Sequence, residues 1–232
     1  MSELSGAMEA PIEIEIDDTT RGIAARSNSY RLFSQAFVFP MGDLLTALLN
    51  GGLRDSLIEC AKGLPYACHY STTDADYPGS DSRDAVSQAF TSLFDNCTGR
   101  PRVSVLERRH VRSTEQTLWE DLLRFYNHFG LDFSHGGATE PPDHINLELE
   151  YMHYLSFLEA GAPQDRTPFL LGQHDFMERH LSIWTNPFAE NVEAEENNEP
   201  YGTLARMLAE FVEADFAHLK AFKENQPDLE DD

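Results

Sequence analysis

The segment from Glu140 to Leu155, EPPDHINLELEYMHYL, places an acid and an imidazole side by side directly after two prolines. Such a pair can serve as a catalytic dyad, as metal ligands, as a helix cap or as a contact for a polar partner group. Prolines fix φ and restrict the residue before them, so the sequence predicts a helix that begins near Pro142. Asp143 would then lie in the first turn, where a negative charge is stabilised by about 0.3–1 kcal/mol. His144 is expected to be neutral, because the same position disfavours a cation.

Two interpretations of the Asp143–His144 pair stay open. The preceding stretch, GLDFSHGGATE, contains glycines and polar residues that are typical of a long loop. A carboxylate at the rim of such a loop, beside apolar helix faces, suits peptide recognition, in which it accepts a basic or amide group. Glu140, Pro142 and the aromatic residues Tyr126 and Tyr151 would complete that binding site. The alternative is a helix cap followed by a surface histidine.

A metal site is the rival hypothesis from a different class of function. Glu107 and His110 are three residues apart, as are Glu150 and His153, and this spacing puts both ligands on one helix face, as in di-iron helical bundles. Such pairs arise by chance at a similar frequency in a chain this rich in glutamate. The additional glutamates that a di-iron site needs on partner helices are not evident. A helical carboxylate/histidine metalloenzyme is therefore kept as the alternative, with hydrogen-bonded histidines as the simpler explanation.

Motifs for nucleophilic or phosphate chemistry are absent from the sequence. It contains no G-x-S-x-G, no G-x-x-x-x-G-K-[ST] and no G-x-G-x-x-G. A Cys-His pair stays open from the sequence alone, but no local motif marks one.

The charge of the chain restricts its partners. Seventeen Lys and Arg face 40 Asp and Glu, and the net charge of −23 argues against a nucleic-acid binder and permits a basic partner. Against this background, the segment RPRVSVLERRHVR carries five arginines and one acid. This arginine segment is a candidate contact for an acidic face of a partner or for an anionic cofactor, or it pairs internally with acidic loops. Its arginines are Arg100, Arg102, Arg108, Arg109 and Arg112.

The cysteines and the first residues indicate a cytoplasmic protein. Cys60, Cys68 and Cys97 form no Cys-x-x-Cys pair and lie near no histidine at zinc-ligand spacing, so they are expected to be reduced. The first 20 residues carry six acids and no base, unlike a signal peptide. No apolar run is long enough for a membrane span, so stable membrane insertion is not expected.

Helical periodicity dominates from Ile23 onward. Apolar residues recur at i, i+3, i+4 and i+7 in segment after segment, and Gly or Pro ends most of these runs. One such run begins at Thr167 and is expected to end before Pro187. The sequence predicts an all-α, single-domain bundle of about seven or eight helices over residues 21–224. Residues 1–20 would form an acidic leader and 225–232 a disordered acidic tail, and a two-lobed arrangement hinged near 71–82 is the second choice.

The stretch YNHFGLDFSHGGATEPPDHINLELEYMHYL resembles the signature of the TorD/DmsD/NarJ-type chaperones, the redox enzyme maturation proteins. That signature is E-P-x-D-H-[IL] followed by E-L-x-[FY]-M-x-x-L. A second element, F-x-x-x-H-L-x-x-W-x-x-x-F, is matched in FMERHLSIWTNPF. The resemblance is strong over about residues 115–190 and loose elsewhere. The positions that match the two elements are Glu140, Pro142, Asp143, His144, Ile145, Glu148, Leu149, Tyr151, Met152, Leu155, Phe176, His180, Leu181, Trp184 and Phe188.

The resemblance implies an all-α cytoplasmic chaperone for a molybdoenzyme of the DMSO reductase family. We therefore expect a protein that is not an enzyme, with no catalytic residues and no cofactor of its own. Such a chaperone binds the twin-arginine signal peptide, or another N-terminal segment, of the enzyme's catalytic subunit until the molybdenum cofactor is inserted. It also implies that Pro142, Asp143 and His144 contribute to the peptide-binding site. An assembly factor for an enzyme that is not exported is the second alternative, beside the metalloenzyme. The loop before Glu140 differs among family members, so the identity of the client does not follow from the motif.

Overall fold

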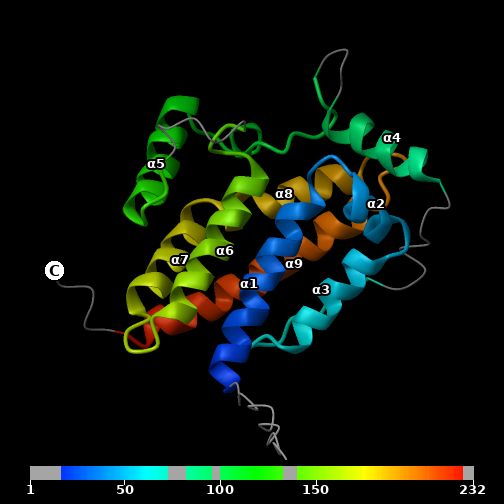
Figure 1. The fold of residues 1–232 in the computed structure, drawn as a ribbon. Coiled ribbons are helices and arrows are strands. Elements are labelled where there is room, and N and C mark those ends of the chain that lie inside the picture. The colour runs from blue at the N-terminus through cyan, green and yellow to red at the C-terminus, as the bar shows by residue number, and fades with distance from the viewer. Residues whose placement is uncertain (1–16, 73–81, 96–99, 133–139, 227–232) are drawn as a thin grey trace, which may run out of the picture.

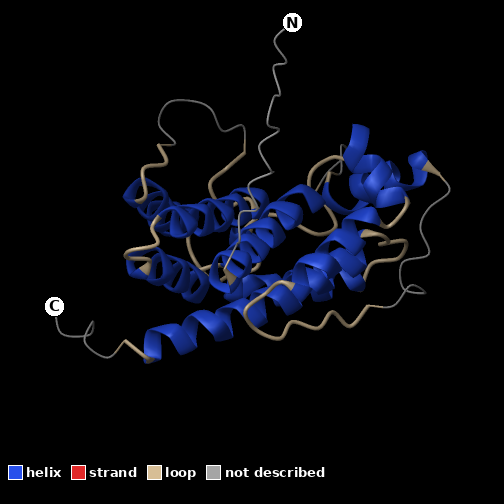
Figure 2. Cartoon of the chain, turned by 60° about the horizontal axis from the view of Figure 1, so that its bottom comes forward, coloured by secondary structure: helices blue, strands red, loops and turns tan. Residues whose placement is uncertain are grey.

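The computed structural model describes residues 17–72, 82–95, 100–132 and 140–226. In this part of the chain the regular elements are nine α-helices and one short 3-10 helix, and no strand occurs (Figure 2). The predicted all-α class is therefore confirmed. Residues 1–16 of the predicted leader, the tail beyond Gln226 and Cys97 lie outside the described residues, whereas Cys60 and Cys68 are free thiols.

Five long helices form the centre of the molecule (Figure 1). Helix α1 (Asp18–Ala36) packs along α6 (Ile145–Gly161), and α8 (Leu181–Glu193) packs along α9 (Tyr201–Glu224). Helix α7 (Thr167–Arg179) joins the two pairs, because it contacts α6, α8 and α9. Each helix thereby buries an apolar stripe against its neighbours, as the periodicity predicted.

The shorter helices surround this centre. Helix α3 lies beside α1, and α2 contacts both α3 and α4. Helix α5 stands at the edge of the bundle, far from α4 (Figure 1). The bounds of these elements are α2 Gly42–Leu49, α3 Gly52–Lys62, α4 Arg83–Phe94, the 3-10 helix η1 Glu107–Arg109 and α5 Glu115–His128.

Aromatic side chains fill much of the core. The ring of Phe211 lies edge-on to Tyr30 at a centroid distance of 4.9 Å and is stacked on Phe33 at 5.5 Å. Trp184 and Phe176 are also fully buried. Large aromatic residues at helical spacing therefore hold the long helices together.

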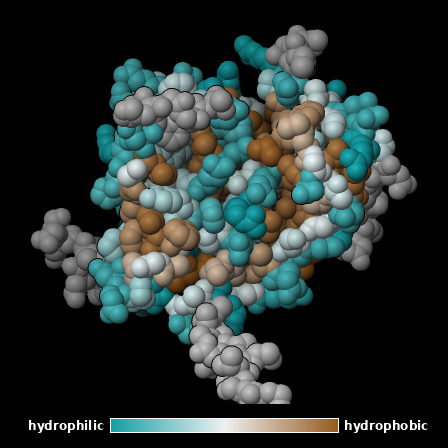
Figure 3. All heavy atoms as spheres, viewed as in Figure 1, coloured by the Kyte–Doolittle hydropathy of each residue, from teal (hydrophilic) through white to brown (hydrophobic). Residues whose placement is uncertain are grey.

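On the surface, Figure 3 shows apolar patches that polar side chains separate, rather than one continuous apolar face.

The sequence predicted one helix from Thr167 to just before Pro187, but the chain forms two helices there, α7 and α8. This split gives the structure one more helix than the sequence suggested. The chain breaks at His180, whose φ and ψ are −128° and −94°, and Pro187 lies inside α8 instead of after it. A proline inside a helix removes one backbone hydrogen bond. Burial of Trp184 and Phe188 on either side of Pro187 offsets that loss.

Side-chain caps begin several helices. Asp17 accepts a hydrogen bond from the backbone N–H of Thr20 at 2.7 Å, so α1 begins at Asp18, earlier than the predicted domain start at residue 21. Thr114 caps α5 in the same way, through the backbone N–H of Thr117 at 3.2 Å. None of the helices in the described ranges is long and apolar enough to cross a membrane.

Candidate functional site at the start of helix α6

Three segments that are distant in sequence meet at the start of α6: the arginine segment, the first turns of α5 and the Pro-Asp-His turn. His144 is the N-cap residue and α6 begins at Ile145, so Asp143 precedes the helix instead of lying in its first turn, as the sequence suggested. The backbone N–H of Glu107 donates to the Asp143 carbonyl oxygen at 2.9 Å, and that of Ile145 donates to Val105 at 2.9 Å. These two bonds fix the arginine segment against the Pro-Asp-His turn.

The Asp143 carboxylate accepts three hydrogen bonds. Arg108 donates from Nη1 to Oδ1 at 2.5 Å and from its backbone N–H to Oδ2 at 3.2 Å. Trp119, in the second turn of α5, donates from Nε1 to Oδ1 at 2.9 Å. The Arg108 Nε also lies 3.2 Å from Glu115 Oε2. We call Asp143, Arg108, Trp119 and Glu115 the Asp143 clasp, because they join the arginine segment, α5 and α6.

The expectation that Asp143 presents its carboxylate at the surface is wrong for this structure. The residue is 0% exposed. Its carboxylate is satisfied by internal donors, since a buried charge is stable only with a counter-charge and hydrogen bonds. Sequence alone gave no reason to pair Asp143 with Arg108, which lies 35 positions earlier. A direct contact between Asp143 and a ligand therefore requires that Arg108 move.

His144 is also buried, and it acts as a cap. Its Nδ1 accepts from the backbone N–H of Asn146 at 3.2 Å, so that nitrogen carries no proton. Burial lowers the pKa of His144, although Glu140 and Asp143 act in the opposite direction. The Nε2 atom lies 3.8 Å from a Glu140 carboxylate oxygen, and the Glu140 residue is exposed. This agrees with the expectation of a neutral imidazole.

A groove of about 500 Å³ lies beside this junction, between α1, the end of α5 and α6. Tyr126 and Tyr151, both predicted to bind a peptide, line it, but each is 1% exposed. The Tyr126 hydroxyl donates to the Pro142 carbonyl oxygen at 2.8 Å, and the Tyr151 hydroxyl donates to the Phe125 carbonyl oxygen at 3.2 Å. These tyrosines therefore form the wall of the groove and tie α5 to the start of α6.

The accessible part of the groove comes from other residues. Its half-buried lining includes Leu147 and Tyr154, and Glu150, Asp132 and Arg31 are exposed at its margin. No motif in the sequence marks Leu147, Tyr154 or Arg31 for binding. Tyr154 lies three positions after Tyr151, and that spacing on a helix was a signal that could have identified it.

A second group of acids lies behind the junction. Glu148 is 0% exposed and accepts from Trp184 Nε1 at 3.0 Å. Burial and the negative charge of Glu107 raise the pKa of Glu148 well above its usual range. Glu107 in turn lies 3.0 Å from the ring nitrogen Nδ1 of His180, whose Nε2 faces Asp121 at 3.4 Å. A neutral Glu148 and a His180 between two carboxylates are the physically stable arrangement here.

The four residues of the metalloenzyme alternative do not come together in one cluster. Glu107 pairs with His180, while His110 Nε2 lies 2.7 Å from the Ser104 carbonyl oxygen. His153 Nδ1 lies 2.8 Å from the Ser27 hydroxyl oxygen, and Glu150 is exposed at the groove. Within the described ranges they form no group that could hold a metal ion. Glu107, His110 and His153 are therefore each held by residues other than their predicted partners.

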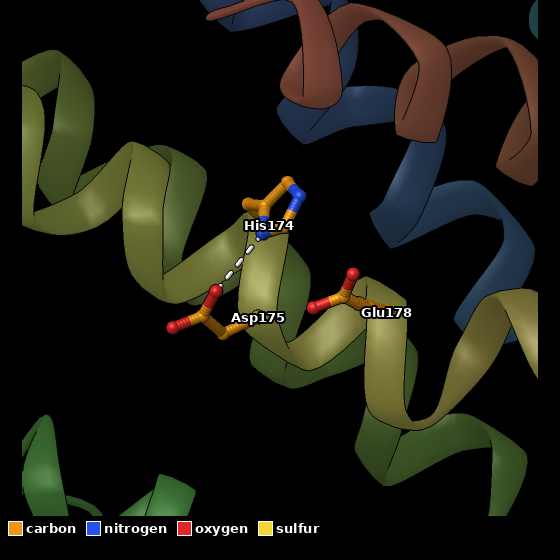
Figure 4. Close-up of side chains that lie close together, drawn as sticks. All are labelled: His174, Asp175 and Glu178. Carbon is orange, nitrogen blue, oxygen red and sulfur yellow. Dashed lines mark hydrogen bonds and ion pairs between the residues drawn. The ribbon is translucent and has the colours of Figure 1, made fainter. Parts of the chain in front are cut away.

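The described chain does bring His174, Asp175 and Glu178 together on α7 (Figure 4). His174 Nδ1 lies 2.9 Å from Asp175 Oδ1, and the Lys223 ammonium lies 3.3 Å from the same oxygen. The lysine already supplies the positive charge that a metal ion would bring, so this cluster does not support a metal site.

Two of the five arginines in the arginine segment form ion pairs with described residues, and three do not. Arg108 belongs to the clasp, and Arg102 pairs with Glu195 at 3.0 Å. Arg100, Arg109 and Arg112 are exposed and form no ion pair with any described residue. Internal pairing therefore explains two of the five arginines.

A separate ionic network lies inside the bundle, near the other end of α6. Arg26, 1% exposed, donates from Nε to Asp215 at 2.6 Å and from Nη1 to Glu159 at 3.0 Å. The Tyr66 hydroxyl donates to Asp215 at 2.6 Å, and the Tyr30 hydroxyl also donates to it. We call these residues the Arg26 network. They link α1, α6 and α9, beneath a cavity of about 730 Å³.

Comparison with known proteins gives the family. A sequence profile described as nitrate reductase delta subunit matches residues 60–190. The selenate reductase assembly chaperone protein of Thauera selenatis is 27% identical and aligns over 88% of this chain and 93% of its own length. The chlorate reductase assembly chaperone protein of Ideonella dechloratans is 29% identical over 82% and 86% of the two chains. The perchlorate reductase assembly chaperone protein of Dechloromonas aromatica is 28% identical over 82% and 88%.

These relatives are named for assembly and not for catalysis, as the resemblance of the Pro-x-Asp-His and Trp-containing elements implied. The matched region contains the arginine segment, α5, the Asp143 clasp and most of the groove. The chain therefore belongs to the nitrate reductase delta subunit family, the group of TorD/NarJ-like maturation chaperones.

Proposed function

We propose that this chain is a non-enzymatic chaperone in the assembly of a molybdenum oxidoreductase, and that it acts in the cytoplasm. It binds an N-terminal segment of the enzyme's catalytic subunit and holds that subunit until its molybdenum cofactor is inserted. The named roles of the relatives support the class of function. The groove between α1, α5 and α6 supports the mode of binding, because its lining is partly apolar and its margin carries Glu150 and Asp132 as well as Arg31.

The observation that carries this proposal is the position of the groove beside the family signature. Tyr126 belongs to the groove wall and is bonded to Pro142, the residue before Asp143. Leu147 and Tyr154 offer apolar contacts, and Glu150 and Asp132 offer negative charge. A basic segment with apolar residues is the ligand that this chemistry fits, and a twin-arginine signal peptide is such a segment.

A charge reversal in the groove tests the proposal. The ligand is a synthetic peptide from the N-terminus of a molybdoenzyme catalytic subunit of the same organism. We expect Glu150→Lys to weaken binding by about tenfold in calorimetry, because an acid at the margin becomes a base. Glu213→Lys is the matched control, since it makes the same charge change at an exposed position of α9. Equal loss in both variants would point to net charge alone, and no binding by the wild type would refute the proposal.

The type of client segment is decided by a second comparison. A peptide that contains the twin arginines and a peptide from the mature N-terminus are titrated separately. Preference for the first supports a client destined for export, and preference for the second supports the assembly factor for a non-exported enzyme. Rising salt is expected to weaken either complex, because exposed charge pairs are screened.

The exposed arginines provide a second candidate contact. Arg100, Arg109 and Arg112 have no described ion-pair partner and sit in a strongly acidic protein. We assign them to an acidic face of the folded client or to its anionic cofactor. Replacement of all three by alanine is expected to weaken binding of the whole catalytic subunit and to spare binding of its N-terminal peptide.

A further inference from the structure

The Asp143 clasp has the chemistry of a receptor for a guanidinium group. A buried carboxylate, Asp143, accepts from Arg108 Nη1, and a second carboxylate, Glu115, lies 3.2 Å from Arg108 Nε. The guanidinium carbon lies 5.4 Å from the centre of the Trp119 ring. Carboxylates in the plane of the donors and an aromatic face beside them are what proteins use to bind arginine.

The group that fills this receptor is the chain's own, and it lies at the edge of the protein. The Arg108 side chain is 18% exposed and that of Glu115 is 56% exposed, whereas the Asp143 side chain is fully enclosed. Arg108 therefore lies between the buried carboxylate and solvent. Its side chain points to that edge and can leave by rotation, without unfolding a helix.

The receptor keeps its other hydrogen bonds when the guanidinium leaves. The backbone N–H of Arg108 and the indole N–H of Trp119 still donate to Asp143. The carboxylate then lacks a counter-charge in a buried position, and this strongly favours the binding of another cation. A vacated clasp is thus a preformed site and not a collapsed one.

We infer that the Asp143 clasp is an arginine receptor, that Arg108 occupies it as an internal substitute, and that an arginine of the client segment exchanges with Arg108. The receptor itself follows from the geometry of the clasp, whereas the identity of the incoming arginine rests on the proposed function. Tyr126 connects the groove to this receptor, because it lines the groove and its hydroxyl donates to the carbonyl oxygen of Pro142, the residue before Asp143. The exchange gives the enclosed Asp143 a direct part in recognition.

The exchange also predicts selectivity for arginine over lysine. The clasp offers acceptors to two different nitrogens of the guanidinium and an indole ring beside them. An ammonium group is a compact point charge that cannot match this planar arrangement. The partner that fits is therefore a segment with an accessible arginine.

Methylguanidinium tests the receptor without any client. The chain has two tryptophans, so the indole N–H signal of Trp119 can be followed by NMR. In Arg108→Ala, methylguanidinium is expected to shift that signal saturably, while the wild type shows a response at least about tenfold weaker because Arg108 competes. The double variant Arg108→Ala, Asp143→Asn should not respond. Equal responses in the wild type and Arg108→Ala, or an equal response to methylammonium, would overturn the inference.

Two further variants guard this experiment against trivial outcomes. Arg83→Ala removes an exposed arginine of α4, outside the clasp, the groove and the arginine segment, and should behave as the wild type. Arg108→Gln keeps a polar side chain and replaces Arg108→Ala if the alanine variant does not fold. If neither variant folds and methylguanidinium does not restore the fold, Arg108 is a fixed structural residue and the inference is wrong.

The client peptide tests the exchange itself. Arg108→Ala is expected to bind the arginine-containing peptide about tenfold more tightly than the wild type, because the internal competitor is gone. A peptide in which lysine replaces arginine should not gain. If the wild type binds the peptide and Arg108→Ala does not bind it better, the exchange fails while the proposed function stands. If no variant binds the peptide but methylguanidinium still binds, the proposed function fails and the receptor stands.

Discussion

Two carboxylate–arginine pairs sit at opposite ends of α6 and differ in their access to solvent. In the Arg26 network, Arg26 is 1% exposed and Asp215 is 0% exposed. In the Asp143 clasp the acid is equally enclosed, but its arginine, Arg108, is 18% exposed. The charged groups of the Arg26 network are enclosed between α1, α6 and α9. In the Asp143 clasp, Arg108 and Glu115 reach solvent at the edge of α5.

This difference separates a structural ion pair from an exchangeable one. Both pairs carry buried negative charge that must be compensated. Arg26 is held by Asp215, Glu159 and Gln173, all of which are buried, so it cannot leave without unfolding the bundle. Arg108 can leave toward water, and another guanidinium can take its place. The same chemistry therefore stabilises the fold at one end and, by our inference, recognises a partner at the other.

The largest expected effect comes from breaking the enclosed network. Arg26→Ala leaves Asp215 and Glu159 buried without their counter-charge, which costs about 3–5 kcal/mol of unfolding free energy. Urea denaturation followed by circular dichroism measures this loss. Tyr30→Phe, which removes one donor to Asp215, serves as a milder control with an expected loss of about 1–2 kcal/mol. A loss below about 1 kcal/mol in Arg26→Ala would contradict the structural role of the network.

A smaller loss of unfolding free energy is expected at the partly exposed pair of Asp143 and Arg108. Asp143→Asn removes the charge that holds Arg108, but Arg108 can then turn to water and Glu115. We expect a loss of about 2–3 kcal/mol, below the range for enclosed pairs. Hydrogen exchange should show the change mainly in α5 and the arginine segment, because Asp143 joins these to α6. Uniform loss of protection across all helices would mean that the clasp is as structural as the Arg26 network.

The contributions of Asp215, in the Arg26 network, and of Glu148, near the clasp, to the free energy of unfolding are expected to change with pH in opposite directions. Burial acts to raise the pKa of Asp215, but the charge of Arg26 and hydrogen bonds from Arg26, Tyr30 and Tyr66 outweigh it and leave that pKa lowered. Its contribution to stability is present above the unfolded value of about 3.9 and is lost as pH falls through the lowered folded value. Glu148, near the clasp, has a raised pKa because of burial and Glu107.

The stability contribution of Glu148 is therefore fully present below its unfolded pKa of about 4.3 and is lost as pH rises through the raised folded value. The folded state holds a proton that the unfolded state releases, so the slope is at most about 1.4 kcal/mol per pH unit. Glu148→Gln keeps an acceptor for Trp184 and removes the titration. The stability of the wild type relative to this variant should fall as pH rises from 4 to 7, and a parallel pH profile for the two proteins would contradict the raised pKa.

The smallest expected effect is at Arg109. This residue is the neighbour of Arg108, but it is exposed and has no ion pair with the described residues. Arg109→Ala should change the unfolding free energy by no more than about 0.5 kcal/mol. The contrast with Arg108→Ala in the same denaturation assay isolates the clasp from the general charge of the arginine segment. A large effect at Arg109 would show that this segment stabilises the fold through charge alone.

Much of the fold could be read from local patterns. The stripe Val86, Ala89, Phe90, Leu93 and Phe94 is buried in α4, as its helical spacing predicted. The break at His180 could not be read, because the apolar period continues through it and burial kept Pro187 inside a helix. Local propensity is a weak guide wherever tertiary packing compensates for a poor residue.

At the candidate site, spacing along the chain was enough to predict that a proline-bounded Asp-His pair stands at the start of a helix and that aromatic residues accompany it. The inward orientation of Asp143, its hydrogen bonds from Trp119 and Arg108, and the groove lined by Leu147 and Tyr154 became visible only in the folded molecule. The physical reason is that helical periodicity depends on neighbours three or four positions apart, whereas the partner of a buried charge is chosen by how distant segments pack.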